Sequence, residues 1–325
     1  MIRRWIVEVP IVALVTGVCE YYLLVNFLPV GIVFLIMIAV LDVELGLAFD
    51  RLTRGNWRAT ADFSLYHTES LKIPIDAGVS LGATLYTPYR EQEHRNEPLP
   101  VIIFAPGFTG SIDLIPWVTL PLVRCGYAVL VYQPRGNGIS EGKRSDILHT
   151  VQDVKKVVDY VATKPEIDIN RCGVIGHSLG GMAALTHAYN HPRVRFVIAI
   201  AAPHDIQAIS NGKKTLFQKI IFLGFKIQGF KSKYTLQENK LVSPKYFLQA
   251  VPENSSRVFL IHAKDDFVNY RTEFLTNATA AELPKENTLL FQKGGHDLRG
   301  QETVAIAQII QWIEKVIGKA TFEEK

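Results

Sequence analysis

Short runs of consecutive apolar residues, bounded by glycine, proline and polar residues, recur through most of the chain. The clearest of these runs indicate buried β-strands at residues 101–104, 196–200, 257–261 and 288–291. Between the first two runs, valines from position 151 to 161 fall on one helical face, which predicts an amphipathic helix over residues 146–163. Strands that alternate with helices in this way predict an α/β domain, with a mostly parallel sheet covered by helices on both faces.

The amino-terminal region has a different pattern, because residues 6–41 are almost continuously apolar. This run explains the positive mean hydropathy of +0.14. It is longer than the apolar part of a secretory signal, which is about 7–15 residues, and about 20 apolar residues already cross a bilayer. We therefore expect residues 1–50 to form a membrane anchor. The anchor is either one span, at 21–41, or a helical hairpin with spans at 5–25 and 27–48.

Positive charges flank this apolar run on both sides. Arginines at positions 3 and 4 precede it, and Arg51, Arg54 and Arg58 follow it within a basic linker at residues 51–61. Because positive flanks favour the cytoplasmic side, a hairpin that returns the chain to the cytoplasm satisfies both of them. We expect localisation to the membrane, with a catalytic domain at residues 62–318 in the cytoplasm and a polar tail at 319–325.

The overall charge bears on the class of binding partner, and the cysteine spacing bears on the redox state of the thiols. The chain has 325 residues, a formal net charge of +4 and no nucleic-acid-binding motif, so we expect no nucleic-acid partner. Its three cysteines lack a framework spacing, which indicates reduced thiols. The motifs imply no metal and no organic cofactor, and the sequence leaves the oligomeric state open.

The motif Gly-His-Ser-Leu-Gly at residues 176–180 carries the most chemical information. It follows an apolar strand and opens into a helix of small residues, which is typical of a nucleophile elbow. Glycines flank the serine because a Cβ at those positions would collide with the adjacent strand and helix. The helix directs its first N–H groups at an oxyanion that forms beside the serine. We therefore predict Ser178 as the nucleophile.

A serine hydroxyl needs a base and a group that orients the base, and in this arrangement they follow in the order serine, acid, histidine. Asp265 and Asp266 come directly after the strand at 257–261, and either could be the acid by position alone. His296 follows the strand at 288–291 behind two glycines, and we predict it as the base. We expect no catalytic role for the other histidines, which are His67, His94, His149, His177, His187, His191, His204 and His262.

From about residue 62 to 317 the chain resembles the α/β-hydrolase superfamily, near its serine-aminopeptidase-like (S33) and monoacylglycerol-lipase-like branches. Residues 262–266 match the His-Gly-x-x-Asp pattern of these relatives with alanine for glycine, and this resemblance implies that Asp266 is the acid. In the loop at 105–110, Pro106 stands where relatives usually have histidine, but the following glycine is kept. The resemblance implies an oxyanion hole formed by the N–H groups of Phe108 and Leu179.

A segment at about residues 204–251 falls where this superfamily places its cap, so we expect a helical lid there. An apolar stripe runs through it at helical spacing, with lysines in between; its apolar members are Leu216, Phe217, Ile220, Ile221, Leu223 and Ile227, and its lysines are Lys213, Lys214, Lys219, Lys226, Lys231 and Lys233. This pattern indicates a lid that contacts an anionic membrane surface. The alternative is a helix packed on its own domain with a solvated lysine face.

These features predict a membrane-anchored serine hydrolase that cleaves a carboxylic ester through a Ser178–His296–Asp266 triad and an acyl-enzyme. Anchor and lid favour a lipophilic small-molecule substrate, such as a monoacylglycerol or another acyl ester. An aminopeptidase and an acyltransferase share the same acyl chemistry and remain alternatives. A catalytically inactive binding protein with the same fold is an alternative of another class.

Overall fold

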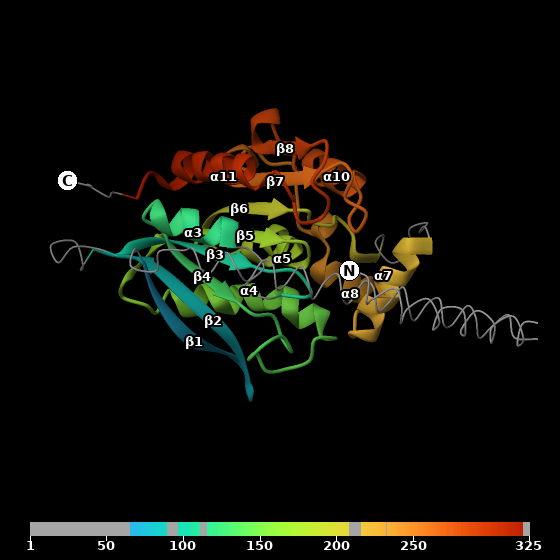
Figure 1. Cartoon of the computed structure of the whole chain (residues 1–325), viewed down its shortest axis with the longest axis horizontal. Coiled ribbons are helices and arrows are strands. Elements are labelled where there is room, and N and C mark those ends of the chain that lie inside the picture. Colours follow the sequence, from blue (N-terminus) through green and yellow to red (C-terminus); the bar gives the residue numbers. More distant parts are fainter. Residues whose placement is uncertain (1–65, 90–96, 111–115, 208–215, 232, 321–325) are drawn as a thin grey trace, which may run out of the picture. The chain divides into compact units, whose positions relative to one another are not determined.

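The computed structural model describes residues 66–89, 97–110, 116–207, 216–231 and 233–320. Within them, eight strands form one sheet in the order β1-β2-β4-β3-β5-β6-β7-β8 (Figure 1). The strands are β1 Tyr66–Asp76, β2 Val79–Pro88, β3 Leu99–Ala105, β4 Ala128–Tyr132, β5 Ile167–His177, β6 Val194–Ile200, β7 Val258–Ala263 and β8 Thr288–Phe291. The principal helices are α3 Pro116–Arg124, α4 Ile147–Val161, α5 Leu179–Ala183, α7 Leu216–Ile227, α8 Leu236–Val242, α10 Arg271–Ala280 and α11 Glu302–Ile317.

The sheet is parallel from β4 to β8 and antiparallel at its other edge. β1 and β2 form a hairpin, and β2 pairs with β4 in the antiparallel sense. The pairs β3–β4, β3–β5, β5–β6, β6–β7 and β7–β8 are all parallel. The carboxyl ends of the parallel strands therefore meet at one edge of the sheet, where open α/β sheets bind their ligands.

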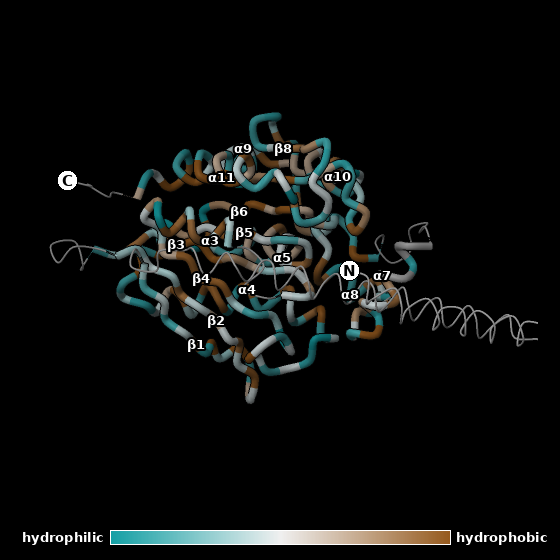
Figure 2. The backbone as a smooth tube through the Cα atoms, in the orientation of Figure 1, coloured by the Kyte–Doolittle hydropathy of each residue, from teal (hydrophilic) through white to brown (hydrophobic). Residues whose placement is uncertain are grey.

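Helices cover both faces of the sheet, and the alternation of side chains along each strand explains why. In β3, Val101 and Ile103 belong to one buried cluster, with residues of α4, α5 and α10. Ile102 and Phe104 point the other way, into a second cluster with residues of α3 and α11. Figure 2 shows hydrophobic residues concentrated in the central strands. The predicted α/β-hydrolase architecture, a mostly parallel sheet between two helical layers, is confirmed for the described residues.

Several predicted elements lie where the sequence placed them. The amphipathic helix expected at 146–163 is α4, and Asp146 caps its first turn by accepting a hydrogen bond from the His149 N–H at 3.5 Å. β5 is longer than its apolar part, because it begins at Ile167 in a partly polar stretch. α3 contains Pro121 within the helix, and α10 has no amphipathic pattern; neither was predicted.

The predicted anchor and the predicted linker lie outside the described residues, and so does most of the polar tail. Among the helices that are described, none combines the length and the hydropathy needed to cross a membrane. The segment predicted as a lid is described in part: it contains α7, α8 and a short 3-10 turn at Pro244–Tyr246, between the end of β6 and the start of β7.

Candidate active site

The nucleophile elbow has the sharp geometry that its glycines predict. Ser178 follows β5 directly and precedes α5, with φ 55° and ψ −116°, a backbone conformation that is strained for a residue with a side chain. A Cβ on Gly176 would lie 2.0 Å from the Gly180 carbonyl oxygen, and one on Gly180 would lie 1.9 Å from the Ala105 carbonyl oxygen. Both glycines are therefore required by the close approach of strand and helix.

His296 and Asp266 form a hydrogen-bonded pair at the ends of two neighbouring strands. Asp266 Oδ2 lies 2.8 Å from His296 Nδ1, and Asp266 Oδ1 accepts hydrogen bonds from the N–H groups of Val268 at 2.8 Å and Asn269 at 3.0 Å. Asp266 is only 3% exposed. These contacts fix the carboxylate, and through Nδ1 they fix the orientation of the imidazole.

The charges of this pair shift both pKa values toward the ionised forms. Burial alone would raise the pKa of Asp266, but the nearby His296 and the hydrogen bonds that the carboxylate accepts lower it. Burial opposes protonation of His296, but the Asp266 carboxylate, with a smaller contribution from Asp297, outweighs burial and raises the pKa of His296. A buried carboxylate that stabilises an imidazolium is the electrostatic requirement of a general base.

The neighbouring carboxylate of Asp265 has a different position. It is exposed, and its oxygens accept hydrogen bonds from the backbone N–H groups of Gly295 at 2.8 Å and Gly294 at 3.3 Å. Both glycines have positive φ, 144° at Gly294 and 60° at Gly295. Asp265 therefore holds the main chain of the loop that carries His296, whereas Asp266 holds the imidazole ring itself.

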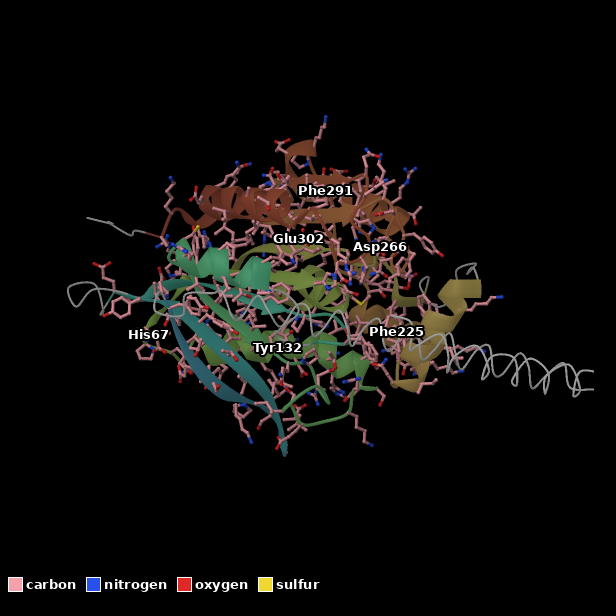
Figure 3. The ribbon with its side chains drawn as sticks, in the orientation of Figure 1. His67, Tyr132, Phe225, Asp266, Phe291 and Glu302 are labelled. Carbon is pink, nitrogen blue, oxygen red and sulfur yellow. The ribbon has the colours of Figure 1, made fainter. Side chains whose placement is uncertain are left out.

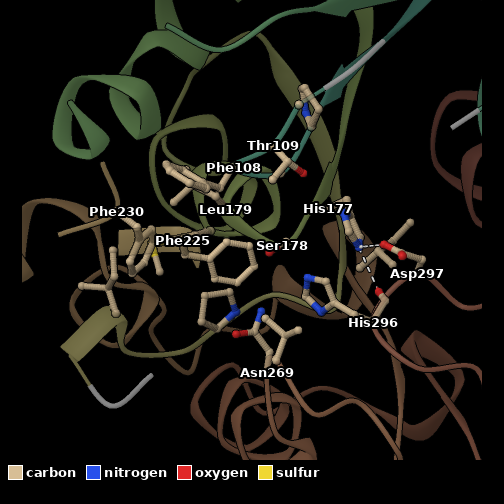
Figure 4. A pocket seen from close by; sticks show the side chains of 18 of the residues that line it. Phe108, Thr109, His177, Ser178, Leu179, Phe225, Phe230, Asn269, His296 and Asp297 are labelled. Carbon is tan, nitrogen blue, oxygen red and sulfur yellow. Dashed lines mark hydrogen bonds and ion pairs between the residues drawn. The ribbon is translucent and has the colours of Figure 1, made fainter. Parts of the chain in front are cut away.

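His177, for which no catalytic role is predicted, lies against His296. The two rings have centroids 4.8 Å apart, and His177 Nε2 lies 2.9 Å from the His296 carbonyl oxygen and 3.7 Å from Asp297 Oδ1 (Figure 4). Burial, with a smaller contribution from His296, lowers the pKa of His177. An uncharged His177 donates from Nε2 to this carbonyl and so ties the His296 loop to the elbow.

The remaining described histidines make local contacts away from Ser178. His187 Nε2 lies 2.8 Å from the Leu241 carbonyl oxygen, and His204 Nδ1 lies 2.9 Å from Asn277 Oδ1. His262 is fully buried, with Nε2 2.9 Å from the Asn269 carbonyl oxygen, and burial lowers its pKa. His149, on α4, pairs with the cap residue Asp146, and His191 pairs with Asp159 of the same helix. The ring of His67 lies 5.4 Å from that of Tyr89. His94 lies outside the described residues.

The loop after β3 brings the residue predicted as an oxyanion donor next to the elbow. A Cβ on Gly107 would lie 3.3 Å from Ser178 Cβ, so the loop passes directly over the serine. The next residue, Phe108, accepts a hydrogen bond at its carbonyl oxygen from Asn137 Nδ2 at 3.5 Å. Leu179, the other predicted donor, is the first residue of α5.

The segment at 132–142 supports this loop through a buried ion-pair network. Arg135 is 4% exposed, and its guanidinium contacts both carboxylate oxygens of Asp153, at 2.6 and 2.7 Å. The same guanidinium contacts Asp76 at 2.5 Å. Since Asn137 lies two residues further on, these contacts hold the side chain that binds the Phe108 carbonyl. The network is structural and lies away from the reacting atoms.

Ser178 opens into a cavity of about 120 Å³ at the carboxyl edge of the sheet. Its lining is mostly apolar and includes Gly107, Phe108, Trp117, His177, Leu179, Met182, Ile200, Ile206, Phe222, Phe225, Phe230, Val268, Asn269, His296 and Asp297. Figure 4 shows Ser178 between the two histidines on one side and the phenylalanines on the other. In Figure 3, Asp266 and Phe225 both lie toward this end of the strands, whereas His67 lies toward the opposite end.

The aromatic side of the cavity comes largely from the predicted lid. Phe225, on α7, meets the ring of Phe108 edge-on at 6.0 Å, and Phe230 does so at 5.3 Å. The ring of Phe222 contacts Phe225 in the same manner at 5.8 Å. None of these three lid phenylalanines belongs to the apolar stripe predicted from the sequence, and two members of that stripe, Leu223 and Ile227, are 50% and 77% exposed. α7 is apolar on nearly all sides, so periodicity alone does not select its inner face.

No cluster of three or more metal-ligating side chains occurs among the residues that the structure describes. The fold and the arrangement around Ser178 define an α/β hydrolase. Solved structures agree on the fold: an esterase from Pyrococcus furiosus has a TM-score of 0.61 at 17% identity, covering 80% of this chain and 96% of that one. A puromycin-hydrolysing peptidase from Mycobacterium tuberculosis has a TM-score of 0.61 at 16% identity, covering 78% of this chain and 40% of that one.

Residues 77–283 match the X-Pro dipeptidyl-peptidase (S15) family, and the chain belongs to this family. Among curated proteins, it is 36% identical over 124 residues to the thiohydrolase apmlB of Arthrinium phaeospermum, which is 36% of this chain and 40% of the relative. It is 25% identical over 182 residues to an uncharacterised 31.7 kDa protein of Escherichia coli, 54% of this chain and 63% of the relative. The matches thus span less than two thirds of these relatives. The predicted superfamily is confirmed; the S33 and monoacylglycerol-lipase-like branches stay predictions.

Proposed function

We propose that the protein is a serine hydrolase that cleaves a carboxylic ester of a lipophilic small molecule. The hydroxyl of Ser178 attacks the acyl carbon while His296 Nε2 takes its proton. His296 then returns this proton to the leaving alcohol as the bond between acyl carbon and alcohol oxygen breaks. Water repeats the sequence on the acyl-enzyme, releasing the acid. Asp266 keeps the proton of His296 Nδ1 in place and stabilises the imidazolium.

The tetrahedral intermediates carry a negative oxygen, which needs hydrogen-bond donors beside Ser178. The backbone N–H groups of Phe108 and Leu179 are our candidates. Phe108 belongs to the loop that passes over the serine, and Leu179 is the first residue of the helix that follows it. Removal of one such donor costs about a hundredfold or more in other acyl-transfer enzymes. The Asn137 side chain donates to the Phe108 carbonyl, which belongs to the following peptide unit, and so supports the loop that carries the candidate donor.

The single observation that carries this proposal is the convergence of Ser178 with the Asp266–His296 pair on one apolar cavity. An ester needs no charged partner for its acyl group. A dipeptidyl-peptidase or an aminopeptidase needs an acidic side chain for the substrate amine, and Asp297 is the acidic residue that lines the described part of the cavity. Asp297 is half exposed and faces His177 at 3.7 Å. This residue keeps an aminopeptidase as the second candidate, and acyl transfer to an alcohol is a variant of the first.

Two features support a membrane location and a lipophilic substrate. Residues 6–41 have the length and hydropathy of an anchor. On α7, Lys219, Leu223, Lys226 and Ile227 are exposed and lie on one helical face. Exposed apolar residues between lysines suit the interface of an anionic bilayer. We propose an integral anchor with the catalytic domain on the cytoplasmic side, and the full chain should stay in the membrane fraction after a carbonate wash.

The test is hydrolysis by the purified full chain, with p-nitrophenyl esters of increasing acyl length beside aminoacyl and X-Pro p-nitroanilides. We expect ester hydrolysis that Ser178→Ala abolishes, and little release from the anilides. Because a relative is named a thiohydrolase, an acyl thioester belongs in the same panel. Preference for the free-amine anilides, lost in Asp297→Asn, would establish the aminopeptidase instead. Unchanged ester hydrolysis in Ser178→Ala would contradict both.

A further inference from the structure

The cavity as a whole has a size that limits what can occupy it. The cavity of about 120 Å³ is smaller than the apolar cavity of about 150 Å³ that holds one benzene molecule in another protein. Benzene has six carbon atoms, so the free space here accommodates about four to six carbons. A longer acyl group extends beyond this space unless a side chain of the lining moves.

This inference rests on the proposed function, because the ester mechanism determines on which side of Ser178 the alcohol portion and the acyl group lie. His296 must reach the leaving oxygen to protonate it, so the alcohol portion lies on the histidine side. Figure 4 shows Phe225 and Phe230 across Ser178 from His296. The acyl group therefore extends toward the phenylalanines, into the part of the cavity that the cap closes.

Phe225 and Phe230 are the lining side chains that end this path. Both are partly buried, and both meet the ring of Phe108 edge-on, at 6.0 and 5.3 Å. Other apolar lining residues, such as Ile200 in β6 and Met182 in α5, belong to the sheet and its covering helix. A change at the two cap phenylalanines alters the cavity without altering the sheet.

We infer that Phe225 and Phe230 are specificity-determining residues that set the maximum length of the acyl group at about four to six carbons. Each methylene that the cavity buries should raise kcat/KM about fourfold. Beyond the limit, further methylenes meet the two rings or stay in water, so the gain ends and kcat/KM falls. Truncation of either ring leaves a space that its surroundings only partly fill, and this space admits a longer chain.

The experiment compares acetyl, butyryl, hexanoyl, octanoyl and decanoyl p-nitrophenyl esters, kept below their aggregation concentrations, on wild type, Phe225→Ala and Phe230→Ala. The measured quantity is the ratio of kcat/KM for decanoyl to that for butyryl. Both rings pack on Phe108, so a variant that disturbs the oxyanion loop slows all esters alike, and this ratio cancels that loss. Phe247→Ala is the matched control, because Phe247 belongs to the same segment but packs on His187, at 5.1 Å, outside the cavity lining.

We expect the wild-type optimum at butyryl or hexanoyl, and a decanoyl-to-butyryl ratio about tenfold higher in Phe225→Ala and Phe230→Ala. Phe247→Ala should keep the wild-type ratio. A wild-type optimum at decanoyl, or equal ratios in all three variants, would overturn this inference while Ser178-dependent hydrolysis still upheld the proposed function. Absence of Ser178-dependent hydrolysis on every ester would instead remove the proposed function and this inference with it.

Discussion

The two sides of the cavity are built in different ways. On the histidine side, Asp266, Asp265 and His177 each form a hydrogen bond to His296 or to the loop that carries it. On the aromatic side, the contacts of Phe225 and Phe230 with Phe108 are ring contacts. Hydrogen bonds fix direction and distance, whereas apolar packing tolerates rearrangement of shape. The molecule thus combines a fixed reaction geometry with a substrate boundary that single substitutions can move.

The largest expected effect is on the histidine side, at the carboxylate that holds the ring. Asp266→Asn should lower kcat by about four orders of magnitude, because an amide can neither hold the required tautomer nor stabilise the imidazolium. The variant should stay folded, because the asparagine Oδ1 still accepts from Val268 and Asn269. Steady-state hydrolysis of the best p-nitrophenyl ester, with thermal unfolding as the control, measures this.

Asp265→Asn is the matched variant one residue away. It keeps an oxygen for the Gly295 N–H and does not touch the His296 ring. Its kcat should therefore fall by no more than about tenfold, the value of one hydrogen bond. Asp265→Ala should lower kcat somewhat more, because the N–H groups of Gly294 and Gly295 both lose their acceptor. If Asp265→Asn is the crippled variant and Asp266→Asn is active, the pairing of carboxylate and ring described above is wrong.

The next effect is the pH dependence of kcat/KM, which should follow the protonation of His296 and not that of His177. The base acts in its neutral form, and its pKa is raised, so kcat/KM should fall as the pH drops through a value above about 6.5, the ordinary pKa of histidine. His177 has a lowered pKa and stays neutral through this range. His177→Gln, which keeps a donor, should therefore leave the acid limb in place.

In Asp266→Asn, the acid limb of the residual activity should shift in the opposite direction from the raised pKa of the wild type. Without the carboxylate the imidazolium loses its main stabilisation, so the acid limb should move to lower pH. A limb that is unchanged in this variant, or one that disappears in His177→Gln, would show that another group governs the profile.

The smallest effect belongs to the outer face of α7. Lysines near an anionic bilayer contribute up to about 1 kcal/mol each, which is about fivefold per lysine and less at high salt. The full chain with Lys219→Glu and Lys226→Glu should turn over a membrane-dissolved ester several-fold more slowly on anionic vesicles than on neutral ones, and a soluble ester at the normal rate. Lys285→Glu with Lys315→Glu, on the body of the domain, is the control. Equal slowing by both pairs would contradict contact through α7.

Much of the fold followed from local pattern, because buried parallel strands are continuous apolar runs and the elbow combines apolar strand, glycines and helix. The position of Ser178 and His296 followed from strand ends and loop glycines. The acid did not follow from position, since Asp265 and Asp266 are adjacent and both contact the histidine loop. Only the main-chain path after β7 decides which carboxylate points inward.

The cap was harder to predict for a related reason. In α7 apolar residues occupy both faces, so a helical period is present but does not identify the inner side. The structure turns Phe222 and Phe225 toward the cavity, and Leu223 and Ile227 outward. Which face is inner depends on packing against Phe108, a residue more than a hundred positions earlier in the chain.

The central claim is that Ser178 is the nucleophile of this cavity, and its most direct measurement is covalent labelling by a fluorophosphonate followed by peptide mass spectrometry. The probe phosphonylates a serine that a base has activated, with loss of fluoride, so an intact triad is needed for fast labelling. We predict a single adduct on the peptide that contains Ser178, slow labelling in Asp266→Asn and none in Ser178→Ala. An adduct on another residue, or equal labelling of Ser178→Ala and wild type, would contradict the account.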